Sequence, residues 1–233
     1  MFVIPTNSLT IQGVCFSKAH YRDELFLQHQ IDMPCAIAQA MPKRKAEFLA
    51  GRLAARAACI SHCSLSPNMQ IGIGSLRAPQ WPMGINGSIS HCYLPSGEGI
   101  ALAACGLCNK LIGIDAEVIF SRQLAAETAE QFTDETERLL IQAAQTTHDY
   151  QIALTAVFSA KESFFKAVAS MVGFYFDFDA IKLTKIEAQQ LSFEIVDVLS
   201  DHFHVGVCIE IDFMVIDNSF VITSLCMNRP ATA

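Results

Sequence analysis

The order of helix and strand patterns along the chain constrains its fold more than any other feature of the sequence. Apolar residues recur at helical spacing in three regions and alternate with polar ones in seven short runs. The predicted helices cover residues 42–63, 133–145 (with Thr133 as its N-cap) and 149–171, and the predicted strands cover 87–93, 98–105, 111–117, 181–186, 191–198, 203–212 and 219–226. Each half of the chain therefore has its own helix and strands, which predicts a pseudo-duplicated α+β arrangement with its site between the halves.

The composition is that of a compact globular protein. Of the 233 residues, 52% are apolar and 17% are charged, which excludes disorder, a coiled coil and collagen. The longest apolar stretch, residues 99–108, is about half of the roughly 20 residues that a membrane span needs, so we expect no span. The N-terminus lacks the basic region of a secretory signal, and we expect a cytoplasmic protein. A net charge of −7 argues against nucleic acid as a partner.

Nine cysteines are scattered along the chain, and this odd number fits buried reduced thiols better than a disulfide framework. Cys59, His62 and Cys63 lie within one helical turn, and Cys105 with Cys108 forms a CxxC pair, so a zinc site is an alternative. The CxxC pair ends an apolar run and has no polar loop around it. We therefore interpret these cysteines as small core side chains.

Two carboxylates lie on the predicted strand LIGIDAE, residues 111–117. Side chains alternate along a strand, so Asp115 and Glu117 share one face while Ile114 and Ala116 share the other. Two carboxylates about 6 to 7 Å apart repel by about 2 to 3 kcal/mol at an effective dielectric of 20, unless a cation lies between them. The pattern indicates a magnesium site, and a solvated strand end is the alternative.

A third carboxylate lies on the predicted helix FSAKESFFKA. Glu162 and Lys166 are four residues apart and share one side of the helix, and Lys161 is adjacent to Glu162. A surface salt bridge is the usual meaning of such a pair, but the phenylalanines around it argue against simple exposure. Carboxylates with lysines among apolar residues suit phosphoryl chemistry, in which cations stabilise the charge on the leaving oxygen.

Ser90 and His91 lie together on the predicted strand 87–93. Adjacent strand residues point to opposite faces, so the two cannot form the nucleophile and base of a hydrolase. A phosphate that accepts a hydrogen bond from His91, with Ser90 at a nearby oxygen, fits the spacing better. A core histidine with satisfied hydrogen bonds is the alternative for His91.

The helix over residues 42–63 carries a concentration of basic side chains on an acidic protein. Arg52 and Arg56 are neighbours on one face, and Arg44 lies about two turns earlier on a nearby stripe. Glu47 is the only acid between residues 43 and 63. Because the net charge is negative, any recognition of phosphate has to be local, and this helix is a candidate for it.

Four segments taken in order, AGRLAARAA, RAPQWPMGINGSISH, GIDAEVI and FSAKESFFKA, resemble the signature of the 4'-phosphopantetheinyl transferase superfamily, in its longer single-chain type. The resemblance extends from about residue 43 to 169. It implies two similar α/β halves related by a pseudo-two-fold axis, with coenzyme A in the cleft between them. The halves would be residues 1–110, with the basic helix and the coenzyme A loop, and residues 111–233, with the metal site.

The resemblance also implies roles for individual residues. Asp115, Glu117 and Glu162 would hold Mg2+, and Glu162 and Lys166 would be catalytic. The coenzyme A contacts would come from Arg44, Arg52, Arg56, Arg77, Ser90, His91, Lys161 and Lys166. Two features depart from the family pattern. Phe158 stands where many members have tryptophan, and Glu135 and Glu137 compete for the place of a further family glutamate, so neither is assigned.

The predicted reaction is transfer of the phosphopantetheine arm of coenzyme A to a serine of an acyl or peptidyl carrier protein, with release of adenosine 3',5'-bisphosphate. Siderophore, polyketide and polyunsaturated fatty-acid synthesis are pathways that use it, and duplication within one chain predicts a monomer. One alternative is a Mg2+-dependent phosphodiesterase or nuclease, against which the net charge counts. A carrier-binding module without catalysis is the other, and the complete set of carboxylates and lysine disfavours it.

Overall fold

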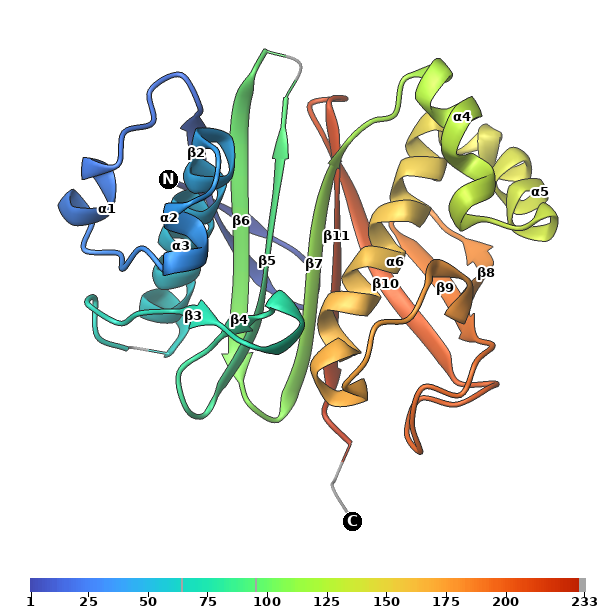
Figure 1. Ribbon diagram of the computed structural model, residues 1–233. Coiled ribbons are helices and arrows are strands. Elements are labelled where there is room, and N and C mark those ends of the chain that lie inside the picture. Colours follow the sequence, from blue (N-terminus) through green and yellow to red (C-terminus); the bar gives the residue numbers. More distant parts are fainter. Residues whose placement is uncertain (64, 95, 231–233) are drawn as a thin grey trace.

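The computed structural model describes residues 1–63, 65–94 and 96–230, whose strands form two antiparallel sheets with long helices packed against them (Figure 1). The helices are α1 (Glu24–Gln28), α2 (Cys35–Ala38), α3 (Pro42–Cys63), α4 (Arg122–Phe132), α5 (Glu135–Ala143) and α6 (Tyr150–Val172), with 3-10 turns η1 (Ser75–Arg77), η2 (Ala144–Thr146) and η3 (Phe178–Ala180). The strands are β1 (Phe2–Pro5), β2 (Thr10–Ser17), β3 (Gly72–Ile73), β4 (Pro79–Gln80), β5 (Ile85–Tyr93), β6 (Glu98–Leu107), β7 (Lys110–Val118), β8 (Ile181–Ile186), β9 (Gln190–Ile195), β10 (Cys208–Ile216) and β11 (Phe220–Asn228).

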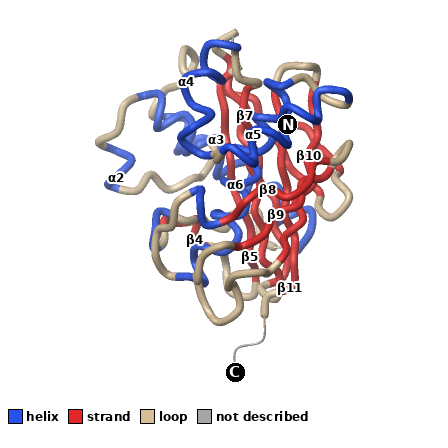
Figure 2. The backbone as a smooth tube through the Cα atoms, turned by 90° about the vertical axis from the view of Figure 1, so that its right-hand side faces the viewer, coloured by secondary structure: helices blue, strands red, loops and turns tan. Residues whose placement is uncertain are grey.

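The two sheets divide the chain into an N-terminal and a C-terminal half. The first has the strand order β1-β2-β6-β5 and the second β7-β11-β10-β9-β8, while β3 and β4 form a separate short pair. Helix α3 packs on β6 and β2, and α6 packs on β7 and β11. Seen from the side, the strands run together as one layer beside these helices (Figure 2). The expected mixed α/β architecture, with one long helix against the sheet of each half, is confirmed.

Strands β5 and β7 belong to different sheets but lie side by side at the centre of the molecule (Figure 1). Serine hydroxyls of β5 connect them. The Oγ of Ser88 accepts a hydrogen bond from the amide of Ile114 at 3.1 Å, and the Oγ of Ser90 accepts one from the amide of Ala116 at 3.2 Å. Both serines are buried, so these bonds form in a region of low dielectric, where leaving the amides unpaired is costly.

Strand β7 is also closely approached by helix α6. A Cβ atom on Gly113 would lie 1.9 Å from the carbonyl oxygen of Ser163, so only glycine permits this approach. On one face of β7, Ile114 and Ala116 lie in an apolar cluster shared by both sheets. On the opposite face, Asp115 meets the side chains of α6. The alternation predicted for this strand is confirmed, and it turns the carboxylate of Asp115 toward α6.

Most of the predicted elements are confirmed, with shifts at their ends. Helices α3 and α6, strands β5 to β7 and the four-stranded C-terminal meander lie close to the expected residues, although the third strand of the meander begins at Cys208 instead of residue 203. The N-cap expected at Thr133 is wrong. Asp134 caps α5 instead, because its carboxylate accepts from the amide of Glu137 and the Glu137 carboxylate accepts from the amide of Asp134. Hairpin β1–β2 and helix α4 were not predicted.

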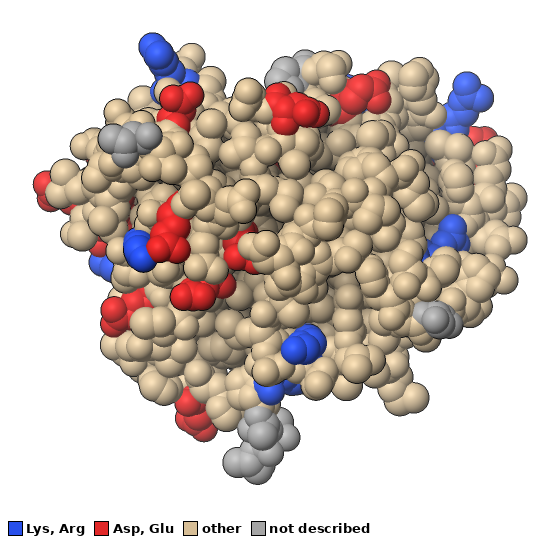
Figure 3. All heavy atoms as spheres, turned by 180° about the vertical axis from the view of Figure 1, so that it is seen from behind, with Lys and Arg blue, Asp and Glu red and all other residues tan. Residues whose placement is uncertain are grey.

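Within the described residues, no helix is both long enough and apolar enough to cross a membrane. On the face opposite to that of Figure 1, lysines and arginines are scattered singly and do not gather into a stripe (Figure 3). That face offers no concentrated basic surface of the kind that tracks a nucleic acid backbone.

Candidate active site

The carboxylate of Asp115 is the centre of a buried polar cluster where the two halves meet. Its Oδ1 atom accepts from the Oγ of Ser90 at 2.8 Å and from the Nζ of Lys166 at 2.5 Å. Its Oδ2 atom accepts from the Oγ of Ser159 at 2.8 Å. Asp115 is 3% exposed, whereas the side chain of Lys166 is 27% exposed. The ion pair therefore joins β7 to α6, and it leaves the lysine accessible from the cleft.

Two further carboxylates, Glu117 and Glu162, lie close enough to interact with this pair. Burial and the charge of Asp115 raise the pKa of Glu117 to about 8. Burial raises the pKa of Glu162, with Asp115 adding to the effect and Lys166 opposing it. No hydrogen bond or ion pair within the described residues reaches either glutamate carboxylate. Three carboxyl groups thus share one nearby ammonium, an excess of acidic groups over cations, and burial favours the protonated form of the two glutamates.

This excess fits a divalent cation. Mg2+ prefers carboxylate oxygens, and a cation beside Glu117 and Glu162 would offset the burial that raises their pKa values. The Asp115 carboxylate already accepts three hydrogen bonds, which by count leaves one lone pair on Oδ2. In the part of the chain that is described, no group of three or more His, Cys, Asp or Glu side chains is close enough together to hold an ion as it stands. The donor chemistry therefore fits a metal, whereas the ammonium of Lys166 occupies the position on Asp115 Oδ1.

Lys166 has a raised pKa, because the ion pair and hydrogen bond with Asp115 outweigh the lowering effect of burial. An ammonium group has three N–H donors, and two of those on Lys166 are used by Asp115 and by the Oγ of Ser90 at 3.2 Å. One donor remains for a ligand in the cleft. The predicted helical pair of Glu162 with Lys166 is not a salt bridge, since Lys166 pairs with Asp115 across the interface.

A second part of the site is a pocket of about 380 Å³ between α3 and β5, which we call the arginine pocket. Its lining consists of Ala36, Ile37, Ala40, Arg44, Glu47, Phe48, Gly51, Arg52, Ile73, Arg77, Pro79, Ile89 and His91. An Nη1 atom of Arg44 lies 3.3 Å from the Oε2 of Glu47 and 3.2 Å from the Nε2 of His91. Arginine can only donate, so Nε2 of His91 accepts and carries no proton. Burial lowers the pKa of His91, Glu47 at 3.7 Å from Nε2 opposes this effect, and Lys166 and Arg44 add to the lowering, so the net direction favours the neutral imidazole.

Arg52 is held firmly at the rim of the arginine pocket. Its Nε donates to the carbonyl of Ile71 at 2.5 Å and its Nη2 to the carbonyl of Gly72 at 2.8 Å. The guanidinium also lies 4.3 Å from the centre of the Phe48 ring. Burial lowers the pKa of Arg52 to about 10, so it remains charged at neutral pH. Its cation contributes to the potential in the pocket, although several of its donors are already used.

A second pocket of about 240 Å³, the cleft pocket, lies next to the arginine pocket, since Arg77, Pro79 and Ile89 line both. The cleft pocket is further lined by Leu76, Ala78, Trp81, Asn86, Gly87, Ser88, Glu162, Phe165, Lys166, Ala169 and Ser170. The cations of α3 and the side chains of Glu162 and Lys166 on α6 therefore line neighbouring pockets.

Three residues predicted to contact coenzyme A, Lys161, Arg56 and Ser90, form hydrogen bonds with other parts of the protein in this structure. The side chain of Lys161 is 1% exposed, and its three donors go to the Oε1 of Glu137 and to the carbonyls of Phe132 and Phe178, at 2.8 to 3.0 Å. It has no N–H left for a phosphate. Burial lowers the pKa of Lys161, and the charge of Glu137 partly compensates.

Arg56 and Ser90 also have partners within the protein. Arg56 donates to the carbonyls of His29 at 2.7 Å and Gln30 at 3.2 Å, and it lies outside both pockets of the site. The single hydrogen of the Ser90 hydroxyl goes to Asp115, and its two lone pairs accept from Ala116 and Lys166. Ser90 and His91 lie on opposite faces of β5, with Ser90 turned to Asp115 and His91 turned to Arg44.

The sequence analysis missed two hydroxyls of the site, and it left one glutamate unassigned. Ser159 lies inside the FSAKE segment and could have been noticed there, but no local signal marks Thr223, which reaches the site through the pairing of β11 with β7. Glu137 serves the structure: it caps α5, accepts from the amide of Leu183 at 2.9 Å and pairs with Lys161. The Asp134-x-x-Glu137 spacing is the sequence signature of that cap.

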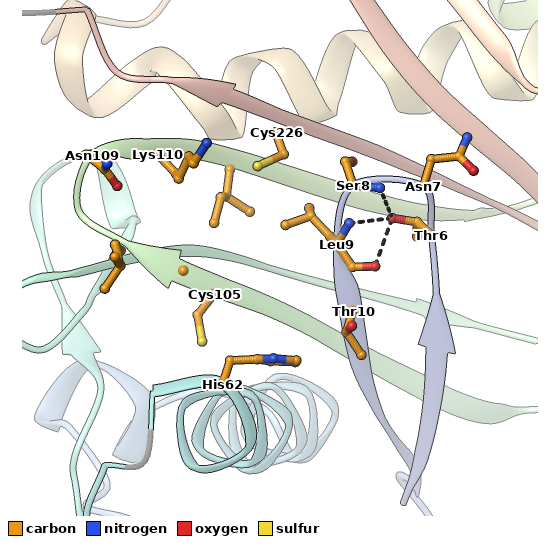
Figure 4. A pocket seen from close by; sticks show the side chains of 13 residues that line it. Thr6, Asn7, Ser8, Leu9, Thr10, His62, Cys105, Asn109, Lys110 and Cys226 are labelled. Carbon is orange, nitrogen blue, oxygen red and sulfur yellow. Dashed lines mark hydrogen bonds between the residues drawn. The ribbon is translucent and has the colours of Figure 1, made fainter.

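A larger pocket of about 530 Å³ lies away from this chemistry, between the N-terminal hairpin and the β6–β7 turn (Figure 4). His62 and Cys105 contribute to its lining. Cys59 is fully buried and Cys105 is 6% exposed, in the apolar cluster beneath α3, and the Sγ atoms of Cys63 and Cys105 lie 3.9 Å apart as free thiols. The interpretation of Cys59 and Cys105 as core side chains is confirmed, whereas Cys108 is exposed.

Comparison with known proteins assigns the chain to a family. Residues 33–105 match the 4'-phosphopantetheinyl transferase N-terminal domain, and residues 111–223 match the 4'-phosphopantetheinyl transferase superfamily. Enterobactin synthase component D of Salmonella typhi is 38% identical over 178 residues, which are 76% of this chain and 68% of that protein. The Salmonella typhimurium protein of the same name is 36% identical over 195 residues, 82% of this chain and 75% of that protein.

More distant matches have the same activity in their names. The 4'-phosphopantetheinyl transferase Svp of Streptomyces mobaraensis is 36% identical over 147 residues, 63% of this chain and 57% of that protein. A solved holo-[acyl-carrier-protein] synthase of Thermotoga maritima covers 51% of this chain, and 63% of its own chain is covered, with a TM-score of 0.37 and 16% identity, too slight a likeness to bear on the fold. Both halves of the sequence match the same family, and the most similar relatives match over most of their length. The chain therefore belongs to the 4'-phosphopantetheinyl transferase superfamily.

Proposed function

We propose that this phosphopantetheinyl transferase moves the phosphopantetheine arm of coenzyme A to a serine hydroxyl of an acyl or peptidyl carrier protein. A bond forms between the serine oxygen and the phosphorus of the arm, and the phosphoanhydride bond breaks to release adenosine 3',5'-bisphosphate. The observation that carries this proposal is the cluster of Lys166, Asp115, Glu117 and Glu162 where the two halves meet, next to the pocket that contains the cations of the basic helix. Family membership supports the reaction class.

The donor's two phosphate groups match two separated sets of cations. We assign the 3'-phosphate to the arginine pocket, which contains Arg44, Arg52, Arg77 and His91. The pyrophosphate would then lie in the cleft pocket, beside the free N–H of Lys166. Arg77 lines both pockets and could contact either group. In this arrangement the proposed division of the chain at residue 110 separates a nucleotide-binding half from a reacting half.

Glu162 would accept the proton in this reaction, and Lys166 would neutralise the developing negative charge. Glu162 has a raised pKa, which suits a general base near neutral pH, and it would take the proton of the acceptor serine. Lys166 would neutralise the charge that develops on the leaving phosphate. Glu117 and Glu162, together with Asp115, would hold the Mg2+ ion. When bound, Mg2+ polarises phosphate oxygens and offsets the negative charge of these carboxylates.

The direct test is the intact mass of candidate apo-carrier proteins after incubation with coenzyme A, Mg2+ and the enzyme. We expect a mass increase of one phosphopantetheine on a carrier that has its acceptor serine, and none on a carrier with that serine changed to alanine. Hydrolysis of a phosphodiester with no change in the carrier would identify the phosphodiesterase alternative. Binding of a carrier without consumption of coenzyme A would identify a module that has lost catalysis.

Relatives named for enterobactin synthesis support a carrier domain of siderophore biosynthesis as the acceptor. We propose a cytoplasmic location, where coenzyme A is available and free thiols persist. Because both pockets are lined by residues of a single chain, we also propose that the enzyme acts as a monomer.

The neutral state of His91 leads to a prediction about pH. Burial holds the pKa of His91 below its usual value in the free enzyme. A phosphate dianion beside the ring would raise that pKa in the complex, so coenzyme A should bind with uptake of a proton. Affinity is then expected to rise as the pH falls from about 8 to 6, by up to about tenfold per pH unit, and to level off below the pKa of the free enzyme.

Isothermal titration calorimetry in two buffers with different ionisation enthalpies measures this proton uptake. Glu47, Arg44, Lys166 and Asp115 also act on His91, so the His91→Ala variant provides the control, and in it the uptake should disappear. The ligand 3'-dephospho-coenzyme A should bind to the wild type with little uptake. Equal proton uptake for both ligands would show that His91 acts away from the 3'-phosphate.

A further inference from the structure

A chain of buried hydroxyl groups leads from the core of the C-terminal half to Asp115. The Oγ of Ser163 lies 2.7 Å from the Oγ1 of Thr223, and that atom lies 2.9 Å from the Oγ of Ser159. The Oγ of Ser159 donates to the Oδ2 of Asp115 at 2.8 Å. All three hydroxyl residues are 0% exposed. Ser159 and Ser163 lie one turn apart on α6, and Thr223 lies on β11 directly opposite Asp115 on β7.

The direction of each hydrogen bond in this row of hydroxyl groups follows from the number of hydroxyl hydrogens available. The carboxylate of Asp115 only accepts, so the single hydroxyl hydrogen of Ser159 is used on it. Thr223 must therefore donate to Ser159, and Ser163 donates to the Oγ1 of Thr223 at 2.7 Å, which is closer than its other acceptor, the carbonyl of Thr223 at 3.4 Å. All the dipoles point toward the carboxylate, an arrangement in which each bond strengthens the next.

These serines behave differently from another buried hydroxyl on the same helix. Thr155 donates to the carbonyl of Gln151 at 2.6 Å, the usual bond to the preceding turn of the helix. The hydroxyls of Ser159 and Ser163 instead point away from the helix backbone, to Asp115 and Thr223. Core packing alone would be satisfied by alanine and valine at these positions, so the hydroxyls call for a further role.

We propose that Ser159, Thr223 and Ser163 are positioning residues for Asp115. By donating to Oδ2 from the core side, the row of hydroxyl groups fixes the plane of the carboxylate, which holds Oδ1 against Lys166 and leaves the second lone pair of Oδ2 for a metal ion. This inference rests on the proposed function, in which Asp115 belongs to the metal-binding group. Hydrogen bonds to the ligands of a metal typically affect metal affinity or activity by 10- to 100-fold.

The test compares four variants by Mn2+ binding, measured by electron paramagnetic resonance in the presence of coenzyme A, together with turnover and melting temperature. Ser159→Ala should weaken Mn2+ binding by about tenfold or more and lower kcat while the KM for coenzyme A changes little. Thr223→Val keeps the shape of the side chain but removes one hydroxyl, and it should weaken binding about two- to fourfold. Thr223→Ser restores the hydroxyl and should bind Mn2+ like the wild type.

Thr155→Val is the matched control, since Thr155 is equally buried on α6 but accepts from the amide of Phe120 and does not reach Asp115. It should lower the melting temperature and leave the Mn2+ affinity unchanged. The proposal is overturned if Ser159→Ala and Thr223→Val behave in the same way as this control. If Ser159→Ala does not fold, the comparison of Thr223→Val with Thr223→Ser decides the matter. A wild type that neither binds Mn2+ nor modifies a carrier would instead contradict the proposed function itself.

Discussion

The Lys166→Ala enzyme is expected to turn over at least about 100-fold more slowly than the wild type, and to melt at a lower temperature because the buried Asp115 loses its ammonium partner. Lys166 is the one cation within hydrogen-bonding distance of Asp115 in the described structure, and it has one N–H free for the cleft. Deleting one preorganised group that stabilises developing charge typically costs this much in kcat. The measurement is kcat for carrier modification at saturating coenzyme A, with the melting temperature as the check on folding.

Lys166→Arg should restore only part of the rate, because a planar guanidinium does not fit where a compact ammonium lies between Asp115 and Ser90. Glu162→Gln separates two roles of the neighbouring carboxylate. Activity should be lost at every Mg2+ concentration if Glu162 is the base, and should recover in part at high Mg2+ if it only binds the metal. Turnover of Lys166→Ala within a few-fold of wild type would remove Lys166 from the reaction.

The second large effect is expected on stability and comes from Lys161, five residues earlier on the same helix. Lys161→Ala should lower the free energy of unfolding by about 3 to 5 kcal/mol, the usual result of removing one partner from a buried ion pair. Glu137 would be left as a buried charge at 3% exposure, and the carbonyls of Phe132 and Phe178 would lose their donor. Urea unfolding followed by circular dichroism measures the change.

Lys161→Met is the accompanying variant, because it keeps the aliphatic volume and removes only the ammonium. It should also be destabilised, which separates the loss of charge from the loss of packing. The double variant Lys161→Met, Glu137→Gln should recover part of the stability, because it removes the unpaired buried charge while an amide oxygen can still accept from the backbone amide of Asp134 or of Leu183. If the Lys161→Ala protein had wild-type stability and bound coenzyme A more weakly, the result would show that Lys161 contacts phosphate and does not have a structural role.

Lys161 and Lys166 show which properties of a residue could be predicted from the sequence and which could not. The segment FSAKESFFKA identified both as functional candidates, and helical spacing placed Glu162 and Lys166 on one side of α6. Spacing along a helix does not tell which element packs on each face. The structure packs α5 and η3 against Lys161 and β7 against Lys166, so one lysine becomes part of the core and the other faces the cleft.

Local sequence patterns were sufficient to predict the orientation of a side chain wherever that orientation depends on a single strand or helix. The alternation of β7 placed Asp115 and Glu117 on one face, and the opposite orientation of adjacent strand residues excluded a pair of Ser90 with His91 acting as nucleophile and base. The family resemblance implied that Ser90 and His91 both contact coenzyme A. The alternation along β5 argues against contacts of both residues with a single phosphate. A side chain with all its hydrogen bonds used, such as Ser90, cannot be recognised from its neighbours in the sequence.

The sequence by itself determined the family, the order of the main helices and strands, and the residue types that carry the chemistry, because these depend on periodicity and on motifs within single elements. Only the tertiary structure decided which donors remain free. Arg56 is bound to the carbonyls after α1, Lys161 is bound to Glu137, and Thr223 joins the site from more than 100 residues after Asp115. The physical reason is that hydrogen-bonding capacity is limited, and the partners that use it come from distant segments of the chain.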